Sequence, residues 1–328
     1  MKVIFMPNGL DADMVEGQQR FLDHQCPINW CLLTDDHRYK KSADLIFYRD
    51  VIIDYGGDII KGLTMLFMLE SPMHTMTFRK DQVVNWTATY RTDSTLNAPY
   101  ERFTPFSNFT KLPDKPDRNY AKGKTKKVAW FVSNCVAANG RFKYAEQLAQ
   151  HINVDIYGSC GQLSCTRHRE QECFQMLQKD YKFYLSFENS NCKDYITEKF
   201  FLNALGNNVL PIVMGARPSD YKRLAPPESF IHVDDFESPE HLAEYLHKLD
   251  KDDDLYNSYF RWKGTGEFID TKFWCRLCSM LHEQASTNTR SWYKLDDWWR
   301  GTGVCISPQD SGLWLVNEFL QLSELVSE

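Results

Sequence analysis

The sequence predicts an α/β protein made of two doubly wound domains, each built on a parallel sheet. Short apolar runs rich in β-branched and aromatic residues alternate with helix-like stretches along most of the chain, as in right-handed βαβ units. The 328 residues also exceed the size at which a single core stops growing. Residues 109–127 lose this pattern and gather Pro, Gly and Lys, which is typical of a linker. We therefore place the domain boundary there.

Each element follows from a local pattern. In the first domain, residues 1–120, apolar runs bounded by turn residues predict four strands: 2–6, 28–34, 44–50 and 64–70. In the second domain, residues 121–305, the same signals predict strands at 128–133, 154–158, 181–188, 209–215 and 229–233, separated by helices at 140–152, 169–179, 195–205 and 238–250. The final segment, 306–328, has apolar residues at helical spacing and is expected to pack back on the domains as a helix.

Composition and charge exclude several classes of function. A net charge of −6 and a pI near 5.9 argue against a general nucleic-acid binder, which needs a basic surface. No window reaches the roughly 18 apolar residues that a membrane-spanning helix requires. Ten cysteines and two glycosylation sequons, at Asn85 and Asn108, favour an oxidising secretory compartment.

The segment 181–205 carries most of the polar chemistry. A strand that ends at Glu188 is followed by the polar loop NSNCKD, and a helix is expected to begin between residues 195 and 197. Helix N-termini attract anions, and Lys199 in the first turn would strengthen such a site. Arg141 opens another helix and has the paired donors that suit a diphosphate. Neither a G-x-G-x-x-G fingerprint nor a P-loop is present, and both cations have a plain alternative as solvated surface residues.

In the first domain, Glu70 ends an otherwise apolar strand. A carboxylate at that position needs water, a partner or a task, so Glu70 is a candidate general base or a cap of the next helix. Arg91 and Asp93 lie further along and form either a structural ion pair or a substrate contact. Cys275 and Cys278 form a CxxC with His282 nearby, which allows zinc, although disulfides fit the compartment better.

These residues carry a resemblance to a known family. The stretch FYLSFENSNCKDYITEK, residues 183–199, resembles the signature of the α1,3-fucosyltransferases of glycosyltransferase family 10. LESPMH, NWTATYRTDST, NGRFKYAEQL, SFIHVDDF, LYNSYFRWK and FWCRLC recur in that family's order. VDIYGSCG, VLPIVMGARP, RWKGTGEF and WWRGTGVC are most similar to the invertebrate enzymes that fucosylate the innermost GlcNAc of N-glycans.

The resemblance implies a GT-B fold, with two Rossmann-like domains facing across a cleft and with GDP-fucose held by the C-terminal domain. It implies that the donor is bound by Arg141, Asn189, Tyr195, Glu198 and Lys199. Glu70 would be the general base, and Glu198 would also stabilise positive charge on the fucose. Acceptor-side candidates are His74, Arg91 and Asp93, with Thr95 departing from the acidic residue that relatives often have there.

The family pattern further implies inverting transfer of L-fucose to the 3-hydroxyl of the innermost GlcNAc of an N-glycan or glycoprotein acceptor. Alternatives are a Lewis-type enzyme acting on lactosamine, a protein O-fucosyltransferase and, more remotely, a non-catalytic glycan-binding module. No metal is expected to be obligatory, and a divalent cation is expected at most to stimulate the reaction. Cys26 and Cys31 should pair with Cys275 and Cys278, in an order that the sequence leaves open, and the roles of Cys160, Cys165 and Cys173 also stay open. The enzyme is expected in the Golgi lumen as a type II membrane protein, whose N-terminal anchor this chain lacks.

Overall fold

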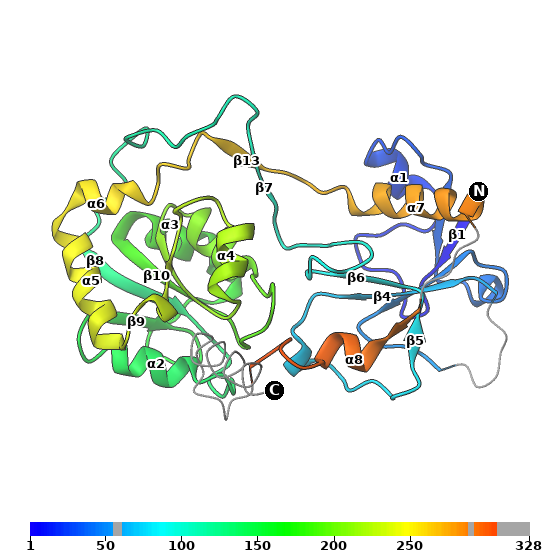
Figure 1. The fold of residues 1–328 in the computed structure, drawn as a ribbon, viewed down its shortest axis with the longest axis horizontal. Coiled ribbons are helices and arrows are strands. Elements are labelled where there is room, and N and C mark those ends of the chain that lie inside the picture. The colour runs from blue at the N-terminus through cyan, green and yellow to red at the C-terminus, as the bar shows by residue number, and fades with distance from the viewer. Residues whose placement is uncertain (55–60, 288–291, 307–328) are drawn as a thin grey trace, which may run out of the picture. The chain divides into compact units, whose positions relative to one another are not determined.

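The computed structural model describes residues 1–54, 61–287 and 292–306, which form two compact units (Figure 1). Of the described residues, unit 1 comprises Met1–Pro99 and Asp270–Val304, and unit 2 comprises Tyr100–Ile269 together with Cys305 and Ile306. Each unit contains its own five-stranded parallel sheet. The predicted α/β class with two Rossmann-like units is therefore confirmed, whereas the expected C-terminal helix at 307–328 lies outside the described residues.

Unit 1 is built around a sheet with the strand order β2-β1-β3-β4-β6. Its elements are the strands β1 (Lys2–Phe5), β2 (Cys31–Thr34), β3 (Leu45–Arg49), β4 (Leu63–Met68), β5 (Val83–Val84), β6 (Trp86–Thr89) and β14 (Tyr293–Lys294), the helices α1 (Gln19–Asp23), α7 (Phe273–Thr287) and α8 (Leu295–Arg300), and the 3-10 turns η1 (His37–Tyr39) and η2 (Pro72–His74). The four predicted strands are present, and β6 is a fifth that the sequence analysis missed.

Unit 2 has the sheet order β12-β11-β10-β8-β9. Its elements are the strands β7 (Phe103–Pro105), β8 (Lys126–Phe131), β9 (Val154–Tyr157), β10 (Tyr181–Phe187), β11 (Leu210–Met214), β12 (Ile231–His232) and β13 (Gly266–Phe268), the helices α2 (Arg141–Leu148), α3 (Glu170–Asp180), α4 (Pro218–Leu224), α5 (Pro239–Lys251) and α6 (Asp253–Ser258), the 3-10 turns η3 (Arg167–Arg169) and η5 (Val233–Asp235), and the π-helix η4 (Lys199–Leu205).

Strand β10 shows why this sheet is central to unit 2. All seven of its residues are buried, as expected for a parallel strand covered on both faces. Phe183, Leu185 and Phe187 pack in one cluster with residues of α2 and α5, whereas Tyr184 packs on the opposite face with Leu177 of α3. Successive side chains of a strand point to opposite faces, so the aromatic and aliphatic residues of this one strand supply both layers of the core.

Both sheets have the same topology. When the strands of each unit are renumbered in chain order, both follow the order 2-1-3-4-5, as in flavodoxin-like folds. In this topology the strand order reverses between the first and third strands, which are β1 and β3 in unit 1 and β8 and β10 in unit 2. Open parallel sheets bind ligands outside the carboxyl ends of the strands at this reversal. Each unit therefore has one place where its topology favours a ligand.

The predicted domain boundary near residue 120 differs from the division in the structure. The linker-like segment packs on unit 2, because the Tyr120 ring stacks on Phe260 at 4.4 Å and β7 pairs with β13. The chain also returns to unit 1 after Ile269, which the prediction of a continuous second domain did not anticipate. Composition identified a solvated stretch, but burial of its few aromatic residues decides which unit it joins.

Disulfides explain the return of the chain to unit 1. Cys26 pairs with Cys275 and Cys31 pairs with Cys278, which confirms the expected set and establishes its order. Both bonds fasten α7 to unit 1. The remaining six cysteines form Cys135–Cys160, Cys165–Cys173 and Cys192–Cys305, so no cysteine is free.

The zinc alternative does not survive this pairing. Cys31, Cys278 and His282 do lie close together, with their ligand atoms within 4.8 Å of one another. However, the two sulfur atoms are bonded to each other and cannot act as thiolate ligands. Separately, no helix among the described residues has the length and apolar character needed to cross a membrane.

Candidate active site

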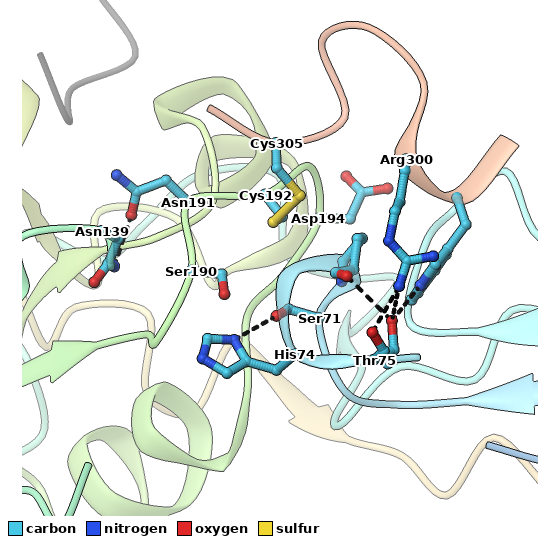
Figure 2. Close-up of a disulfide and its surroundings, with 12 residues drawn as sticks. Ser71, His74, Thr75, Asn139, Ser190, Asn191, Cys192, Asp194, Arg300 and Cys305 are labelled. Carbon is cyan, nitrogen blue, oxygen red and sulfur yellow. Dashed lines mark hydrogen bonds between the residues drawn. A yellow bond between two sulfur atoms is a disulfide. The ribbon is translucent and has the colours of Figure 1, made fainter. Parts of the chain in front are cut away.

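The topological reversal in unit 2 brings together two loops, one after β8 and one after β10. Asn139, from the first loop, donates through Nδ2 to the carbonyl of Glu188 at 2.9 Å and to Asn191 Oδ1 at 3.0 Å, both in the second loop. Figure 2 shows Asn139 and Asn191 meeting in this way. This side chain, which sequence reasoning missed, fixes the relative position of the two loops that carry the predicted donor residues.

Arg141 lies at the start of α2, where the loop after β8 ends. Its guanidinium is buried and donates to the carbonyls of Phe187 at 2.8 Å and Asn134 at 2.9 Å. Among the described residues it makes no ion pair, and its Nε has no hydrogen-bond partner. Burial lowers the pKa of Arg141, and the charge of Glu188 opposes that shift. The arrangement leaves a positive charge without direct neutralisation at the edge of the sheet that favours ligands.

Glu188 is the first residue after β10 and is completely buried. Its carboxylate accepts from the backbone N–H of Thr197 at 2.8 Å and from the Thr197 hydroxyl at 2.8 Å, and lies 3.1 Å from Lys199 Nζ. Burial raises the pKa of Glu188, and the Lys199 charge opposes that shift. The carboxylate therefore fastens both ends of the loop NSNCKDYITE.

Gly215 makes room for Glu188. A Cβ at this position would lie 2.7 Å from both Cβ and Cγ of Glu188, and the backbone φ of +149° is one that other residues rarely adopt. The glycine follows β11, the neighbour of β10 in the sheet. The sequence signal that could have identified Glu188 as a buried anchor is therefore this Gly at the end of the next strand.

Lys199 Nζ is surrounded by three acceptors. It lies 2.9 Å from Thr197 Oγ1, 3.0 Å from Glu198 Oε1 and 3.1 Å from Glu188 Oε2. Burial opposes its charge, but the two carboxylates outweigh burial and raise its pKa, so Lys199 stays an ammonium. Glu188 is inaccessible, whereas the Glu198 side chain is 45% exposed. Glu198 is thus the partner that an incoming anion can replace.

The helix that follows the loop differs from the prediction. It begins at Lys199, not between residues 195 and 197, and it is a seven-residue π-helix. Tyr195 is buried in the preceding loop, and Asn189, half-buried, accepts from the Ser190 hydroxyl at 3.1 Å. All the predicted donor residues of 188–199 therefore lie in or beside one loop, but Lys199 acts through its side-chain contacts and not through a regular α-helix N-terminus.

Two further contacts hold this loop. Asp194 has a positive φ of 61°, and Arg223 of α4 donates to Asp194 Oδ1 at 2.6 Å and to Asp220 Oδ1 at 2.8 Å. Cys192 is bonded to Cys305 (Figure 2). The N–H of the next residue, Ile306, donates to the Asn191 carbonyl at 2.9 Å. A strained backbone held by several contacts is typical of a binding loop. None of these contacts was predicted.

In unit 1, Glu70 lies two residues beyond the carboxyl end of β4. The N–H of Ser71 donates to Glu70 Oε1 at 2.7 Å, and η2 follows directly. Thr75, just beyond, accepts through its hydroxyl from Trp299 Nε1 at 3.0 Å and through its carbonyl from Arg300 at 2.7 Å. The segment that carries Glu70 is thus fixed by α8, as Figure 2 shows for Thr75 and Arg300.

The acceptor-side candidates lie in different environments. Arg91 is buried and forms a bidentate pair with Asp93, at 2.9 and 2.6 Å, while its guanidinium lies 4.2 Å from the Trp298 ring. This geometry favours the structural ion pair that the sequence left open. His74 is exposed, with Nδ1 3.3 Å from the Ser71 hydroxyl (Figure 2). His74 remains an acceptor-side prediction.

One of the two predicted glycosylation sites is wrong. Asn85 is only 1% exposed, and its Oδ1 accepts from the N–H of Thr64 within the sheet at 3.0 Å. A glycan on this side chain would have to break the sheet. Asn108 is exposed and stays a prediction.

Comparison with a solved structure identifies the fold. The structure described as "Crystal Structure of alpha1,3-Fucosyltransferase with GDP-fucose" matches with a TM-score of 0.56 and 16% sequence identity, covering 88% of this chain and 90% of that one. Together with the two parallel-sheet units, this defines a GT-B glycosyltransferase fold.

Sequence comparison identifies the family. The model "Fucosyltransferase, N-terminal" matches residues 4–101, and "Glycosyltransferase family 10 (fucosyltransferase) C-term" matches residues 121–298. The chain belongs to glycosyltransferase family 10. It is 53% identical to glycoprotein 3-alpha-L-fucosyltransferase A of Drosophila melanogaster over 93% of this chain and 61% of that protein. It is 36% identical to alpha-(1,3)-fucosyltransferase fut-6 of Caenorhabditis elegans, over 88% of this chain and 77% of that protein.

Proposed function

We propose that this protein transfers L-fucose from GDP-β-L-fucose to the 3-hydroxyl of the innermost GlcNAc of N-glycans, with inversion at the fucose C1. The observation that carries the proposal is the position of two cations, Arg141 and Lys199. They lie near the loops after β8 and β10, where the strand order of the unit 2 sheet reverses and a ligand site is favoured. The 53% identity to a glycoprotein 3-alpha-L-fucosyltransferase supports the glycoprotein acceptor and the 3-linkage.

The donor side performs the leaving-group chemistry. The diphosphate of GDP-fucose would pair with Lys199 and displace the exposed carboxylate of Glu198. The buried carboxylate of Glu188 would keep its contact with the Lys199 ammonium and hold it in place. Arg141 would supply a second positive charge through its unpaired Nε. Once displaced, Glu198 is free to stabilise positive charge that develops on the fucose ring. Two cations then neutralise the departing GDP, so the proposed reaction requires no metal for this step.

The acceptor side supplies the base. Glu70, ionised, removes the proton from the 3-hydroxyl as that oxygen attacks C1 of fucose. The bond from C1 to the diphosphate oxygen breaks in the same step, and its electron pair leaves with GDP. Because the donor is β-linked, attack from the opposite face yields the α-linked product.

We further propose that the reaction takes place in the Golgi lumen, the compartment that ten cysteines in five disulfides favour.

Substitution of Glu70 tests the assignment of the base. Glu70→Gln keeps the size of the side chain but removes its basicity, so transfer should fall by about 100-fold or more, since general acid–base catalysis contributes roughly 10²–10⁴. GDP-fucose affinity, measured by calorimetry, should stay unchanged because the donor residues belong to unit 2. Glu244→Gln, the same change at an exposed position on α5, is the control. Normal transfer by Glu70→Gln would disprove the role of Glu70 as base.

A further inference from the structure

Unit 1 contains a pocket of about 240 Å³ at the carboxyl ends of its strands. Its lining includes Asp11, after β1, Arg49, the last residue of β3, and Leu69, which follows β4. The lining also includes the aromatic residues Phe67 and Phe273. These strand ends include the reversal point between β1 and β3, the place in unit 1 where the topology favours a ligand. None of these residues was a candidate from the sequence.

The lining combines two kinds of chemistry. Phe67 and Phe273 are in edge contact, with ring centroids 5.4 Å apart, and both rings are half-buried, so an apolar face remains accessible. Asp11 and Arg49 form an ion pair whose side chains are 41% and 25% exposed. Apolar walls with a few charged groups that fix orientation are typical of small-molecule sites. A sugar presents the same combination, with apolar C–H groups between polar hydroxyl and amide groups.

The size of the pocket limits its occupant. Pockets that enclose drug-sized ligands measure roughly 300–1,000 Å³. The pocket in unit 1, at about 240 Å³, is smaller and suits part of a single monosaccharide unit. A whole oligosaccharide does not fit.

The pocket lies next to the proposed base. Leu69 lines the pocket and directly precedes Glu70. On the neighbouring strand, Arg49 lines the pocket and directly precedes Asp50. In the sheet, Arg49 is the register partner of Phe67 of β4, and the N–H of Asp50 donates to the Phe67 carbonyl at 3.0 Å, so these two strand ends lie side by side. Glu70 itself does not line the pocket, but it is one residue away from the lining residue Leu69, within reach of a sugar whose substituent fills the pocket.

We propose that this pocket binds the acetamido group and adjoining ring face of the acceptor N-acetylglucosamine. The inference rests on the proposed function and follows from the chemistry of that sugar. The acetamido group is attached to C2, which is bonded to C3, so a sugar that presents its 3-hydroxyl to Glu70 must place its acetamido group only a few atoms away. The acetamido methyl contacts Phe67 and Phe273, while Asp11 and Arg49 form hydrogen bonds with the polar groups of the sugar.

The test fills the pocket without touching the base. Ala98 lines the pocket and is 7% exposed, so Ala98→Leu places extra carbon atoms in the space assigned to the acetamido methyl. Ala149→Leu is the same change at an exposed position in unit 2 and serves as the control. A methyl-sized group in an apolar pocket is worth about 10–200-fold in discrimination. KM for a chitobiosyl-asparagine glycopeptide should therefore rise at least about tenfold in Ala98→Leu, with unchanged GDP-fucose affinity and no change in Ala149→Leu.

A second variant and a direct binding measurement keep the inference falsifiable if Ala98→Leu fails to fold. Asp11→Asn should also raise KM for this acceptor while leaving GDP-fucose affinity unchanged. Saturation-transfer NMR with chitobiosyl-asparagine should show the acetamido methyl of one GlcNAc as the most strongly saturated group, and Asp11→Asn or Ala98→Leu should weaken that signal.

The outcomes separate this inference from the proposed function. If the wild type transfers fucose but Ala98→Leu and Asp11→Asn both retain normal KM and normal saturation, the pocket assignment is wrong and the function stands. If the acetamido signal depends on the pocket but no fucose is added to the glycopeptide, the pocket assignment stands and the proposed transfer is wrong.

Discussion

Replacing Glu188 by Gln should both destabilise unit 2 and weaken binding of GDP-fucose. The carboxylate is fully buried and bonds two groups of Thr197 as well as Lys199. Removing one partner of a buried ion pair costs about 3–5 kcal/mol, because the other charge is left uncompensated. Gln keeps an oxygen that still accepts from Thr197, so we expect about 3 kcal/mol, at the lower end of that range.

The magnitude converts into a measurable change in melting temperature. For a unit the size of Tyr100–Ile269, each kcal/mol shifts Tm by roughly 2–4 °C, so Glu188→Gln should lower Tm by about 6–12 °C. Differential scanning calorimetry measures the shift. Glu172→Gln removes an exposed ion pair with Arg169 in the same unit and should leave Tm unchanged. A double-mutant cycle with Lys199→Met should show a coupling of about 0.5–3 kcal/mol. A Tm for Glu188→Gln within about 1 °C of the wild type would refute the anchoring role of Glu188.

Two further predictions concern the donor loop and the core. The Cys192–Cys305 bond holds the loop that carries the donor residues. In steady-state kinetics, the Cys192→Ser/Cys305→Ser double variant should therefore raise KM for GDP-fucose more than KM for the acceptor. An equal rise in both KM values would contradict the proposed role of this disulfide in holding the donor loop. Burial lowers the pKa of His232 from 6.5 to about 4, so the unfolded chain binds more protons between these values. The free energy of unfolding, from urea titrations, should therefore decrease as the pH falls from 6.5 to 4. The decrease should be shallower in His232→Asn. The same dependence of the free energy of unfolding on pH in both proteins would show that His232 does not cause it.

The sequence predicted most of the fold because the apolar pattern is strong where strands are buried on both faces. β11 is apolar throughout and β10 is mostly so, with Lys182 and Ser186 as its exceptions, and both were expected within two residues of their observed ends. β6, with the sequence WTAT, was missed because half of its residues are Thr and its burial depends on neighbouring strands. The domain boundary was misplaced for a similar reason, since the packing of Tyr120 on Phe260 is a tertiary contact.

The site was predictable where a single loop carries it and unpredictable where distant segments meet. Asn189, Tyr195, Glu198 and Lys199 lie in one motif, so proximity in sequence guaranteed proximity in space. The bond between Cys192 and Cys305 joins residues that are 113 positions apart, and no local pattern indicates it. Asn85 shows the opposite failure, because a sequon is a local pattern whose use depends on exposure, which the sheet removes.

The pocket of unit 1 was equally invisible from sequence. Asp11, Arg49 and Phe273 are ordinary residues in their own segments, and only the parallel sheet and the two disulfides of α7 bring them together. In contrast, the sequence predicted that unit 1 contains a parallel sheet. Once the strand order is known, the rule that ligands bind where the strand order reverses predicts a site at this pocket.

The most direct test of the proposed function is mass spectrometry of the protein incubated with GDP-fucose and an N-glycopeptide that carries terminal GlcNAc, followed by fragmentation to locate any added deoxyhexose. We predict one deoxyhexose on the GlcNAc attached to asparagine, linked through its 3-hydroxyl. Deoxyhexose found only on the antennae would contradict the assigned acceptor, and no addition at any GlcNAc would contradict the proposed transferase activity itself.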